Sequence, residues 1–388
     1  MKIAVIALPI SPFSFFGKSH AGGGQVNLFN LVTHLPSYYK IDIYTSSQKE
    51  NLPYQKNQNN LNLFELPISR DEIVKNPQKF AKEITNNKSY DFIHAFYYLS
   101  GIVGIEVKKQ LQIPLVQSFW TLEKIKRYYM KDYIEDKKRV SYEQKIVEKA
   151  DKIIANTSHE KDDLIHYYHS NPQKIEIIPP GICFNNFYDC TKKESLQKLR
   201  LSSNDKYLLF VGRMDPIKGL PILIKALCQL SDVIPNLKLI ITGGDKLDSY
   251  YLEMQKLIKS CGLENKIIMR EAQPHQDLHY YYNSADITIM PSHHETFGLV
   301  AMESMSCGTP IIASNVGGLK TFIVNGKNGL LFTKGDVNDL TKKIVYLLQN
   351  EKERKRIASS GVKTSKNYTW NKIIKKYLSL YQSLPERI

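Results

Sequence analysis

Short apolar segments alternate with segments of helical periodicity along most of the chain. In the first half, runs that are apolar at nearly every position predict buried strands at residues 2–8, 40–46, 91–97, 113–120, 151–157 and 174–180. Between them lie amphipathic patterns such as Gln25–Leu35, in which Val26, Phe29 and Val32 share one face. This alternation is typical of a parallel sheet covered by helices.

The second half repeats the same scheme. Its apolar runs predict strands at residues 207–213, 237–244, 265–272, 286–292 and 310–315, and its periodic segments predict helices at 220–230, 277–285 and 298–307. A polar stretch from about Asn185 to Asp205 separates the halves. We therefore expect an α/β protein of two Rossmann-like domains, residues 1–190 and 191–369, facing a central cleft. Ligands of such sheets bind at the carboxyl ends of the strands.

Length and composition fit this division. A chain of 388 residues is long enough for two domains, and 42% hydrophobic residues can supply two cores. The opening MKIAVIALPI is predicted as a buried strand rather than a signal peptide, and no run approaches the roughly 20 apolar residues of a membrane span. The five cysteines are odd in number and lack a C-x-x-C spacing, which favours reduced thiols and a cytoplasmic protein.

The net charge of +15 permits two interpretations. The basic residues are scattered, as compositional drift in a Lys-rich and Asn-rich chain would leave them. Alternatively, they form a surface that meets an anionic acceptor or the face of an anionic membrane, which would make the protein membrane-peripheral. Nucleic acid is disfavoured as a partner, and the sequence does not indicate an oligomeric state.

The most informative segment is HHETFGLVAMESMSCGTPIIASNVGGL, residues 293–319. Glu295 falls in the loop at the carboxyl end of a predicted strand, just before a short helix. The backbone amides of Phe297, Gly298 and Leu299 head that helix without intrahelical partners. Such a helix end attracts anions, phosphate in particular.

Glu303 lies inside the same helix on a largely apolar face, since Leu299, Val300, Ser306 and Cys307 are its neighbours at three and four residues. A carboxylate there needs hydrogen-bond donors. A ribose diol supplies two donors about one helical turn from a bound phosphate. The alternative is that Glu303 pairs with a Lys or Arg of a neighbouring element and that Glu295 only favours the helix dipole.

Two cations favour the first interpretation. Arg213 ends a predicted strand, and Lys218 follows five residues later, before the next helix. Both would project from the carboxyl edge of one sheet. Positive charge at that place is what a diphosphate leaving group needs, because negative charge builds on it as the bond to the sugar breaks.

These motifs resemble a known family. GRMDPIKG and ADITIMPSHHETFGLVAMESMSCGTPIIASNVGGL, together with DFIHAFYYLSG, QSFWTLEKIKR and ADKIIANTSHEKDDL in the first half, resemble the retaining glycosyltransferases of family four, the glycosyl transferases group 1 of the GT-B fold. The glutamates of that family are separated by seven residues, as are Glu295 and Glu303. The resemblance covers nearly the whole chain.

The resemblance implies roles for matching residues of this chain. Arg213 and Lys218 would hold the diphosphate of a nucleotide sugar, with UDP as the expected nucleotide, and Glu303 would bind its ribose. Glu295 and the amides of residues 297–299 would hold the sugar and the distal phosphate. Further donor contacts are implied for Gly23, Gly24, Met269 and Arg270, the last two in the base pocket. The helix around Trp370, residues 370–388, would cross back onto the first domain.

No cofactor or metal is expected. The chain contains no Asp-x-Asp and no convincing set of His and Cys ligands, which agrees with a reaction in which Arg and Lys do the work of a divalent cation. Retention of configuration follows from the resemblance. The leaving phosphate would take the proton of the acceptor hydroxyl on the same face of the sugar.

The chain departs from the family pattern at Phe96, Trp120 and Cys183, where members often have His, His and Asp. Because the imidazole at the Trp120 position commonly reaches the 6-hydroxyl of the donor sugar, Trp120 is a candidate donor contact that recasts this subsite. The alternative is that it only fills core space. His94, at a strand end, is likewise either a catalytic candidate in the cleft or a satisfied buried histidine.

The acceptor side is less defined. The stretch Leu122–Arg139 is basic and aromatic at helical spacing, which makes Thr121, Lys126 and Arg139 candidates for contact with an anionic acceptor. It could equally be a solvated helix face.

Two other functions remain open at this point. One is a nucleotide-sugar epimerase or hydrolase on the same scaffold, and the other is a non-catalytic basic protein that binds surfaces. The sequence does not identify the donor sugar, the acceptor or the pathway.

Overall fold

The computed structural model describes residues 1–8, 22–46, 60–66, 69–86, 88–129, 133–184, 187, 190–244 and 249–385. The chain forms two compact units. The first unit comprises the described residues up to Gly181 together with the chain from Trp370 onward, and the second unit runs from Ile182 to Thr369. The chain thus leaves the first unit at Gly181, not at residue 190. The backbone explains the earlier boundary, because Ile182 pairs with Thr369 in an isolated bridge inside the second unit.

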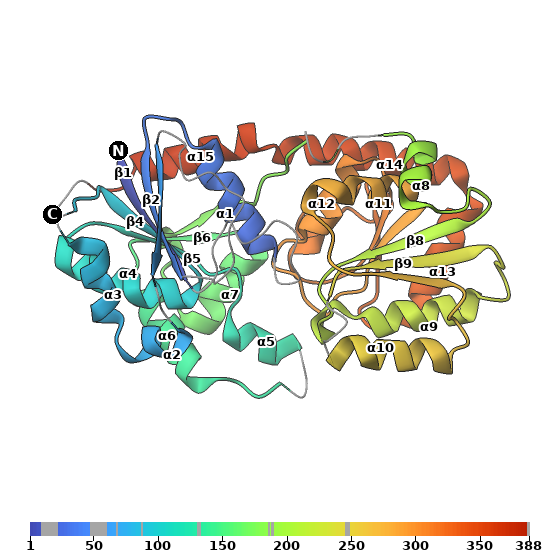
Figure 1. The fold of residues 1–388 in the computed structure, drawn as a ribbon, viewed down its shortest axis with the longest axis horizontal. Helices are drawn as coiled ribbons and strands as arrows, with labels where there is room; N and C mark the ends of the chain where they lie inside the picture. The colour runs from blue at the N-terminus through green and yellow to red at the C-terminus, as the bar shows by residue number, and fades with distance from the viewer. Residues whose placement is uncertain are drawn as a thin grey trace. The chain divides into compact units, whose positions relative to one another are not determined.

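The first unit is built on a parallel sheet. Within the described residues it has seven strands in the order β3-β2-β1-β4-β5-β6-β7 (Figure 1). The strands are β1 (Lys2–Ala7), β2 (Lys40–Ser46), β3 (Leu61–Leu66), β4 (Phe92–Phe96), β5 (Leu115–Ser118), β6 (Lys152–Ala155) and β7 (Ile175–Ile177). Its helices are α1 (Gly23–His34), α2 (Arg70–Lys75), α3 (Pro77–Thr85), α4 (Tyr97–Leu111), α5 (Glu123–Tyr129), α6 (Lys137–Lys149), α7 (Ser158–Tyr168) and α15 (Trp370–Gln382).

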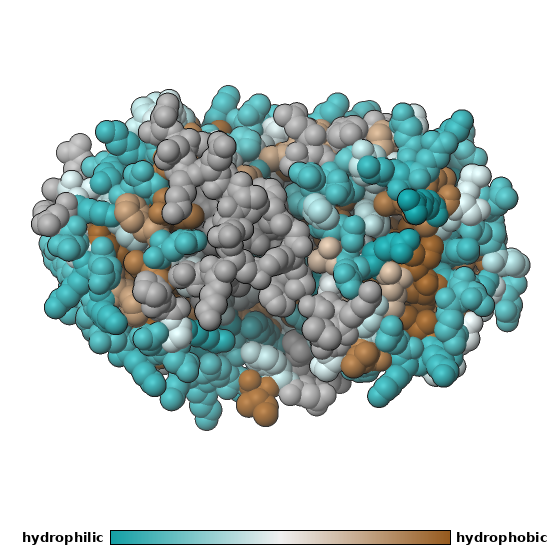
Figure 2. Space-filling view, viewed as in Figure 1, coloured by the Kyte–Doolittle hydropathy of each residue, from teal (hydrophilic) through white to brown (hydrophobic). Residues whose placement is uncertain are grey.

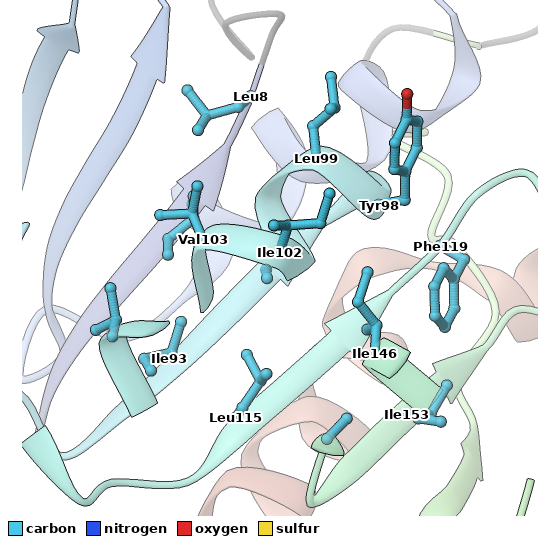
Figure 3. Packing of buried hydrophobic residues seen from close by; sticks show 14 of the residues in the cluster. Leu8, Ile93, Tyr98, Leu99, Ile102, Val103, Leu115, Phe119, Ile146 and Ile153 are labelled. Atoms are coloured by element: carbon cyan, nitrogen blue, oxygen red, sulfur yellow. The ribbon is translucent and has the colours of Figure 1, made fainter. Parts of the chain in front are cut away.

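The core of the first unit lies between this sheet and its helices. Figure 3 shows Leu99, Ile102 and Val103 of α4 beside Ile93 of β4 and Leu115 of β5. Each of these side chains is 8% exposed or less. Full burial of one such side chain stabilises the fold by roughly 1.5–3 kcal/mol. The central strands are apolar at nearly every position because helices cover both faces of the sheet.

The second unit repeats the architecture with a six-stranded parallel sheet, again counted over the described residues, in the order β10-β9-β8-β11-β12-β13. The strands are β8 (Lys206–Val211), β9 (Leu237–Thr242), β10 (Ile267–Arg270), β11 (Ile287–Met290), β12 (Ile311–Ser314) and β13 (Leu330–Phe332). The α-helices are α8 (Lys192–Leu199), α9 (Leu220–Leu230), α10 (Ser249–Ser260), α11 (Leu278–Ser284), α12 (Leu299–Ser306), α13 (Val337–Gln349) and α14 (Glu351–Ser365). Two parallel sheets flanked by helices confirm the prediction of two Rossmann-like α/β domains.

Short 3-10 turns complete the loops of the two units. They are η1 (Pro172–Lys174), η2 (Pro216–Lys218), η3 (His275–Asp277), η4 (Gly317–Thr321) and η5 (Lys366–Tyr368). Hydrophilic residues cover most of the described surface on the face drawn in Figure 2.

Helix α15 completes the first unit. Trp370, its first residue, is 2% exposed and stacks on His34 of α1 with the ring centroids 5.4 Å apart. A Cβ atom at Gly181 would lie 2.6 Å from the indole, so only glycine allows the chain to pass there. The expected helix thus spans Trp370–Gln382, and residues 386–388 lie outside the described residues.

Replacing this tryptophan tests the packing of α15. Trp370→Ala should lower the free energy of unfolding of the first unit by about 3–5 kcal/mol, because a large buried side chain is lost and leaves a cavity. Hydrogen exchange read by mass spectrometry should show faster exchange in α1 and β1, with β8 and β9 unchanged. Tyr346→Ala, at a side chain that is 44% exposed on α13, is the matched control. Equal loss of protection in both units would contradict this assignment.

Candidate functional site

The loop between β11 and α12 carries Glu295. Its Oε1 atom accepts hydrogen bonds from Lys218 Nζ at 2.7 Å and from Ser292 Oγ at 2.8 Å. The Glu295 side chain is 11% exposed, so the carboxylate is partly shielded from water. Helix α12 begins at Leu299, and the amides of residues 297–299 therefore stand at its start as the sequence predicted.

Lys218 reaches Glu295 because two loops pack backbone against backbone. His293 N donates to Ile217 O at 2.7 Å, which ties the loop after β11 to the turn η2 after β8. Gly219, next along the chain, has φ +66°, and a Cβ atom there would lie 2.1 Å from Pro291 O. A larger residue would push the loops apart. Two side chains that are 77 residues apart in sequence are thereby brought into contact.

The turn after β12 fixes the other side of the same loop. Gly318 N donates to Glu295 O at 2.7 Å, and a Cβ atom at Gly318 would lie 2.1 Å from Thr296 O. Phe297 is 5% exposed and packs on Phe322, with ring centroids 5.1 Å apart. The backbone around Glu295 is thus held between a glycine turn and a buried aromatic ring.

Arg213 lies at the same sheet edge, directly after Gly212 at the end of β8. Its side chain is 55% exposed, and Nη2 contacts Asp215 at 3.2 Å. An exposed pair of this kind contributes little to stability, so the guanidinium can exchange this partner for an anion at low cost. The structure therefore brings Lys218 and Glu295 together and leaves Arg213 exposed at the same edge of the sheet.

Glu303 is buried one turn into α12, with 4% of the residue exposed. Its Oε1 contacts His275 Nε2 at 2.8 Å, and its Oε2 accepts from the Tyr282 hydroxyl at 2.6 Å. Neither partner was expected from the sequence, which predicted either a ribose or a Lys or Arg side chain as the partner of Glu303. The only indication of these partners in the sequence was that both residues lie near the start of helix α11, within PHQDLHYYY.

Burial and the neighbouring Glu303 carboxylate raise the pKa of Tyr282 well above its ordinary value. The Tyr282 hydroxyl is therefore a permanent donor. A carboxylate can accept about four hydrogen bonds, so each Glu303 oxygen retains acceptor capacity.

Met269 and Arg270 end the edge strand β10. Gly243 N donates to Arg270 O at 3.1 Å, and Ala272 N donates to Gly244 O at 3.3 Å. The ends of β9 and β10 are thereby joined, and Met269 is half-buried while Arg270 is exposed. Both residues lie at the same carboxyl edge of the sheet as Arg213.

In the first unit, Gly24 and Trp120 are neighbours. A Cβ atom at Gly24 would lie 2.4 Å from the Trp120 indole, so the ring occupies the space beside the first turn of α1, which starts at Gly23. Trp120 has φ +62°, a left-handed conformation that is uncommon for a bulky residue. It also lies 5.4 Å from the buried ring of Phe96, centroid to centroid.

His94 lies fully inside the first unit. Its Nδ1 is 2.8 Å from the Tyr381 hydroxyl of α15, and its Nε2 is 3.0 Å from Ser118 Oγ. Burial lowers the pKa of His94 to about 3. The side chain is 0% exposed, and this geometry favours the satisfied buried histidine over the catalytic group in a cleft.

The acceptor-side candidates form one cluster with residues that sequence reasoning missed. Arg139 Nη2 donates to Thr121 Oγ1 at 2.9 Å, and its Nε donates to Glu143 at 2.7 Å. Lys126 joins through Glu123, whose carboxylate lies 3.6 Å from Lys126 Nζ and 3.2 Å from Arg139 Nη1. Burial lowers the pKa of Lys126.

A second guanidinium extends this cluster to the surface. Arg70, which is exposed, donates to the Tyr98 hydroxyl at 2.8 Å. The guanidinium carbons of Arg70 and Arg139 lie 6.0 and 4.8 Å from the centre of the Tyr98 ring. Arg139 is only 3% exposed, so the accessible part of the cluster is Arg70 and Thr121.

In the part of the chain that the structure describes, no three His, Cys, Asp or Glu side chains come together in a way that could hold a metal ion. No described helix has both the length and the apolar composition needed to cross a membrane. All five cysteines lie in described residues and none forms a disulfide, and burial raises the pKa of Cys183 to about 11.

Comparison with known proteins extends these observations. Residues 191–364 match the family described as "Glycosyl transferases group 1", and residues 21–185 match "Glycosyltransferase Family 4". The D-inositol 3-phosphate glycosyltransferase of Corynebacterium glutamicum is 31% identical over 406 residues, which cover 98% of this chain and 96% of the relative.

Solved structures show the same fold. Sucrose-phosphate synthase of Thermosynechococcus elongatus superposes with a TM-score of 0.90 at 26% identity, covering 98% of each chain. HepE of Anabaena, in complex with UDP and glucose, superposes with a TM-score of 0.80 at 20% identity, covering 99% of this chain and all of HepE.

The burial of His94 predicts a pH effect on stability. Because its pKa is about 3 in the folded state against about 6.5 in an unfolded chain, the unfolded state binds more protons between these values, and acid destabilises the fold. At pH 5 this one group should cost about 2 kcal/mol relative to pH 7. Urea unfolding at both pH values should therefore show a smaller loss of stability on acidification for His94→Gln than for the wild type. An identical pH dependence would contradict a neutral, buried His94.

Proposed function

Because this chain belongs to the family 4 glycosyltransferases, and its residues 191–364 match the glycosyl transferases group 1, we propose that it transfers a sugar from a nucleoside-diphosphate sugar. The proposed acceptor is a hydroxyl group of a phosphorylated polyol, and the proposed outcome is retention of the anomeric configuration. The chain is a glycosyltransferase by its family, and the proposal concerns its donor, its acceptor and its stereochemistry.

The contact of Lys218 and Ser292 with the Glu295 carboxylate, just before α12, is the observation that carries the donor proposal. An ammonium group has three donors, and one of them is used on Glu295. The remaining donors, the exposed Arg213 and the amides of residues 297–299 can meet a diphosphate. Lys218 and the amides are held in place before the reaction, and fixed donors stabilise the charge that develops on the leaving group.

Glu303 supports a nucleoside as the rest of the donor. Its carboxylate lies one helical turn beyond the amides that would hold phosphate, and it retains acceptor capacity for a ribose diol. Uracil is the proposed base, since HepE was solved with UDP. Contacts of Met269 and Arg270 with the base, and of Gly23, Gly24 and Trp120 with the rest of the donor, remain predictions.

In the proposed reaction the acceptor oxygen bonds to the anomeric carbon as the bond to the diphosphate breaks. The leaving phosphate accepts the proton of the acceptor hydroxyl on the same face of the sugar, so no separate base is needed. Arg213 and Lys218 would neutralise the diphosphate without a metal cofactor. Cysteines that form no disulfide support a cytoplasmic site of action.

The acceptor proposal rests on the cluster of Arg70, Thr121 and Arg139. The exposed Arg70 guanidinium and the exposed Thr121, whose hydroxyl accepts a hydrogen bond from the buried Arg139, suit a phosphate group. The relative from Corynebacterium glutamicum is named for D-inositol 3-phosphate. A phosphorylated polyol therefore accounts for both observations.

The donor site is tested by two substitutions in the second unit. Lys218→Ala and Glu295→Gln should each lower kcat/KM for UDP-glucose by about 100-fold or more, because each removes a fixed group beside the developing charge. Lys343→Ala, at a surface pair with Asp339, is the matched control and should leave the rate unchanged. Proton NMR of the product should show an α linkage.

Two results would contradict the donor proposal. Full activity in both variants would remove Lys218 and Glu295 from the reaction. Release or isomerisation of the sugar without an acceptor, at the rate seen with one, would favour the hydrolase or epimerase.

The acceptor site is tested in the first unit. Arg70→Ala and Thr121→Val should raise KM for D-inositol 3-phosphate by about tenfold each, since each removes a hydrogen bond to a charged group. Neither change should affect KM for the donor, and Arg127→Ala, at a side chain that is 66% exposed on α5, is the control. If the wild type uses myo-inositol without phosphate equally well as an acceptor, the phosphate group is not what the acceptor site recognises.

A further inference from the structure

Both oxygens of the Glu303 carboxylate contact side chains of one neighbouring segment. His275 contacts Oε1 at 2.8 Å, and Tyr282 donates to Oε2 at 2.6 Å. His275 belongs to the turn η3, and Tyr282 belongs to α11, which follows directly. A single donor would leave the carboxylate free to turn about its terminal bond, whereas one donor on each oxygen fixes its plane.

The segment that supplies these donors is itself anchored. Thr309 Oγ1, after α12, donates to the backbone oxygen of Tyr282 at 2.7 Å. The ring of Phe187 meets the His275 ring edge-on with the centroids 4.8 Å apart, and Tyr282 is 0% exposed. The distance between each donor and Glu303 is therefore set by packing rather than by mobile side chains.

The stereochemistry matches a vicinal diol. Each oxygen of Glu303 has one acceptor position taken and one left. The two vacant positions lie on different oxygens of a carboxylate whose plane is fixed. Two adjacent hydroxyl groups of a ribose can donate to them together, and the hydrogen bonds then form without further loss of side-chain freedom.

We propose that His275 and Tyr282 are positioning residues, which orient the Glu303 carboxylate to accept both hydroxyl groups of the donor ribose. This inference rests on the proposed function, because it requires that Glu303 meets the ribose. A merely structural role is the alternative, in which the two donors only satisfy a buried charge. The roles differ in one respect: orientation affects how strongly the site distinguishes a diol from a sugar that lacks it.

The test is a comparison of two ligands on each variant. Isothermal titration calorimetry first identifies which of UDP, ADP and GDP binds the wild-type protein most tightly. The same measurement with the 2′,3′-dideoxy form of that nucleotide gives a discrimination ratio. The wild type should prefer the ribose form by about tenfold or more, and Glu303→Gln should lose most of this preference.

Tyr282→Phe and His275→Ala should each reduce the discrimination ratio at least threefold. His275→Gln, which keeps a donor, should restore part of it. Should Tyr282→Phe fail to fold, the two His275 variants make the same comparison. Tyr207→Phe is the matched control. It removes the hydroxyl of another buried tyrosine in the same hydrophobic cluster, and that hydroxyl donates to Ser202 O rather than to Glu303.

The outcomes distinguish failure of the positioning role from failure of the donor proposal. Equal weakening of both ligands in Tyr282→Phe and His275→Ala, with the ratio unchanged, overturns the positioning role and leaves the donor proposal intact. The same holds if Tyr207→Phe reduces the ratio as much. A wild-type protein that binds none of the three nucleotides, or does not distinguish the dideoxy form, overturns the ribose role of Glu303 and the inference with it.

Discussion

Close approach of backbone to backbone at a few glycines determines the geometry of the second unit. At Gly219 and Gly318 a side chain would meet a carbonyl oxygen of the neighbouring loop at 2.1 Å. Because these positions carry no Cβ, the loops that leave β8, β11 and β12 can hydrogen-bond to one another directly. The Lys218 side chain then has only a short distance to cross to Glu295. A parallel sheet brings strand ends to one edge, and the glycines bring the loops close enough for Lys218 to contact Glu295.

The two glutamates of α12 show how one short element can support two environments. Glu295 precedes the helix, pairs with a cation and stays partly accessible. Glu303 lies in the interior one turn into the helix, where hydrogen bonds from a histidine and a tyrosine offset the loss of water. Both environments arise from tertiary contacts, since the helix itself is short and largely apolar.

Sequence reasoning reached the fold because strand burial and helix periodicity are local properties. It also reached Lys218 and Glu295, since residues at the ends of adjacent parallel strands must share an edge. It could not find His275 or Tyr282 as partners of Glu303, because that pairing depends on how α11 packs on α12. Arg70 was missed for the same reason: it comes 69 residues before Arg139, and only the fold places both beside Tyr98. Burial of His94 was one of the two alternatives, because the residue lies in an apolar strand, whereas the burial of Arg139 was not encoded in any local pattern.

The return of the chain to the first unit at Trp370 has a consequence for biosynthesis. The second unit is, in topological terms, an insertion between Gly181 and Trp370. On the ribosome the sheet of the first unit emerges before the inserted unit, but α15 emerges only after the whole of the second unit has been made. The surface of α1 that receives α15 stays uncovered during that interval. Completion of the first unit therefore has to follow synthesis of the second, although the first unit begins the chain.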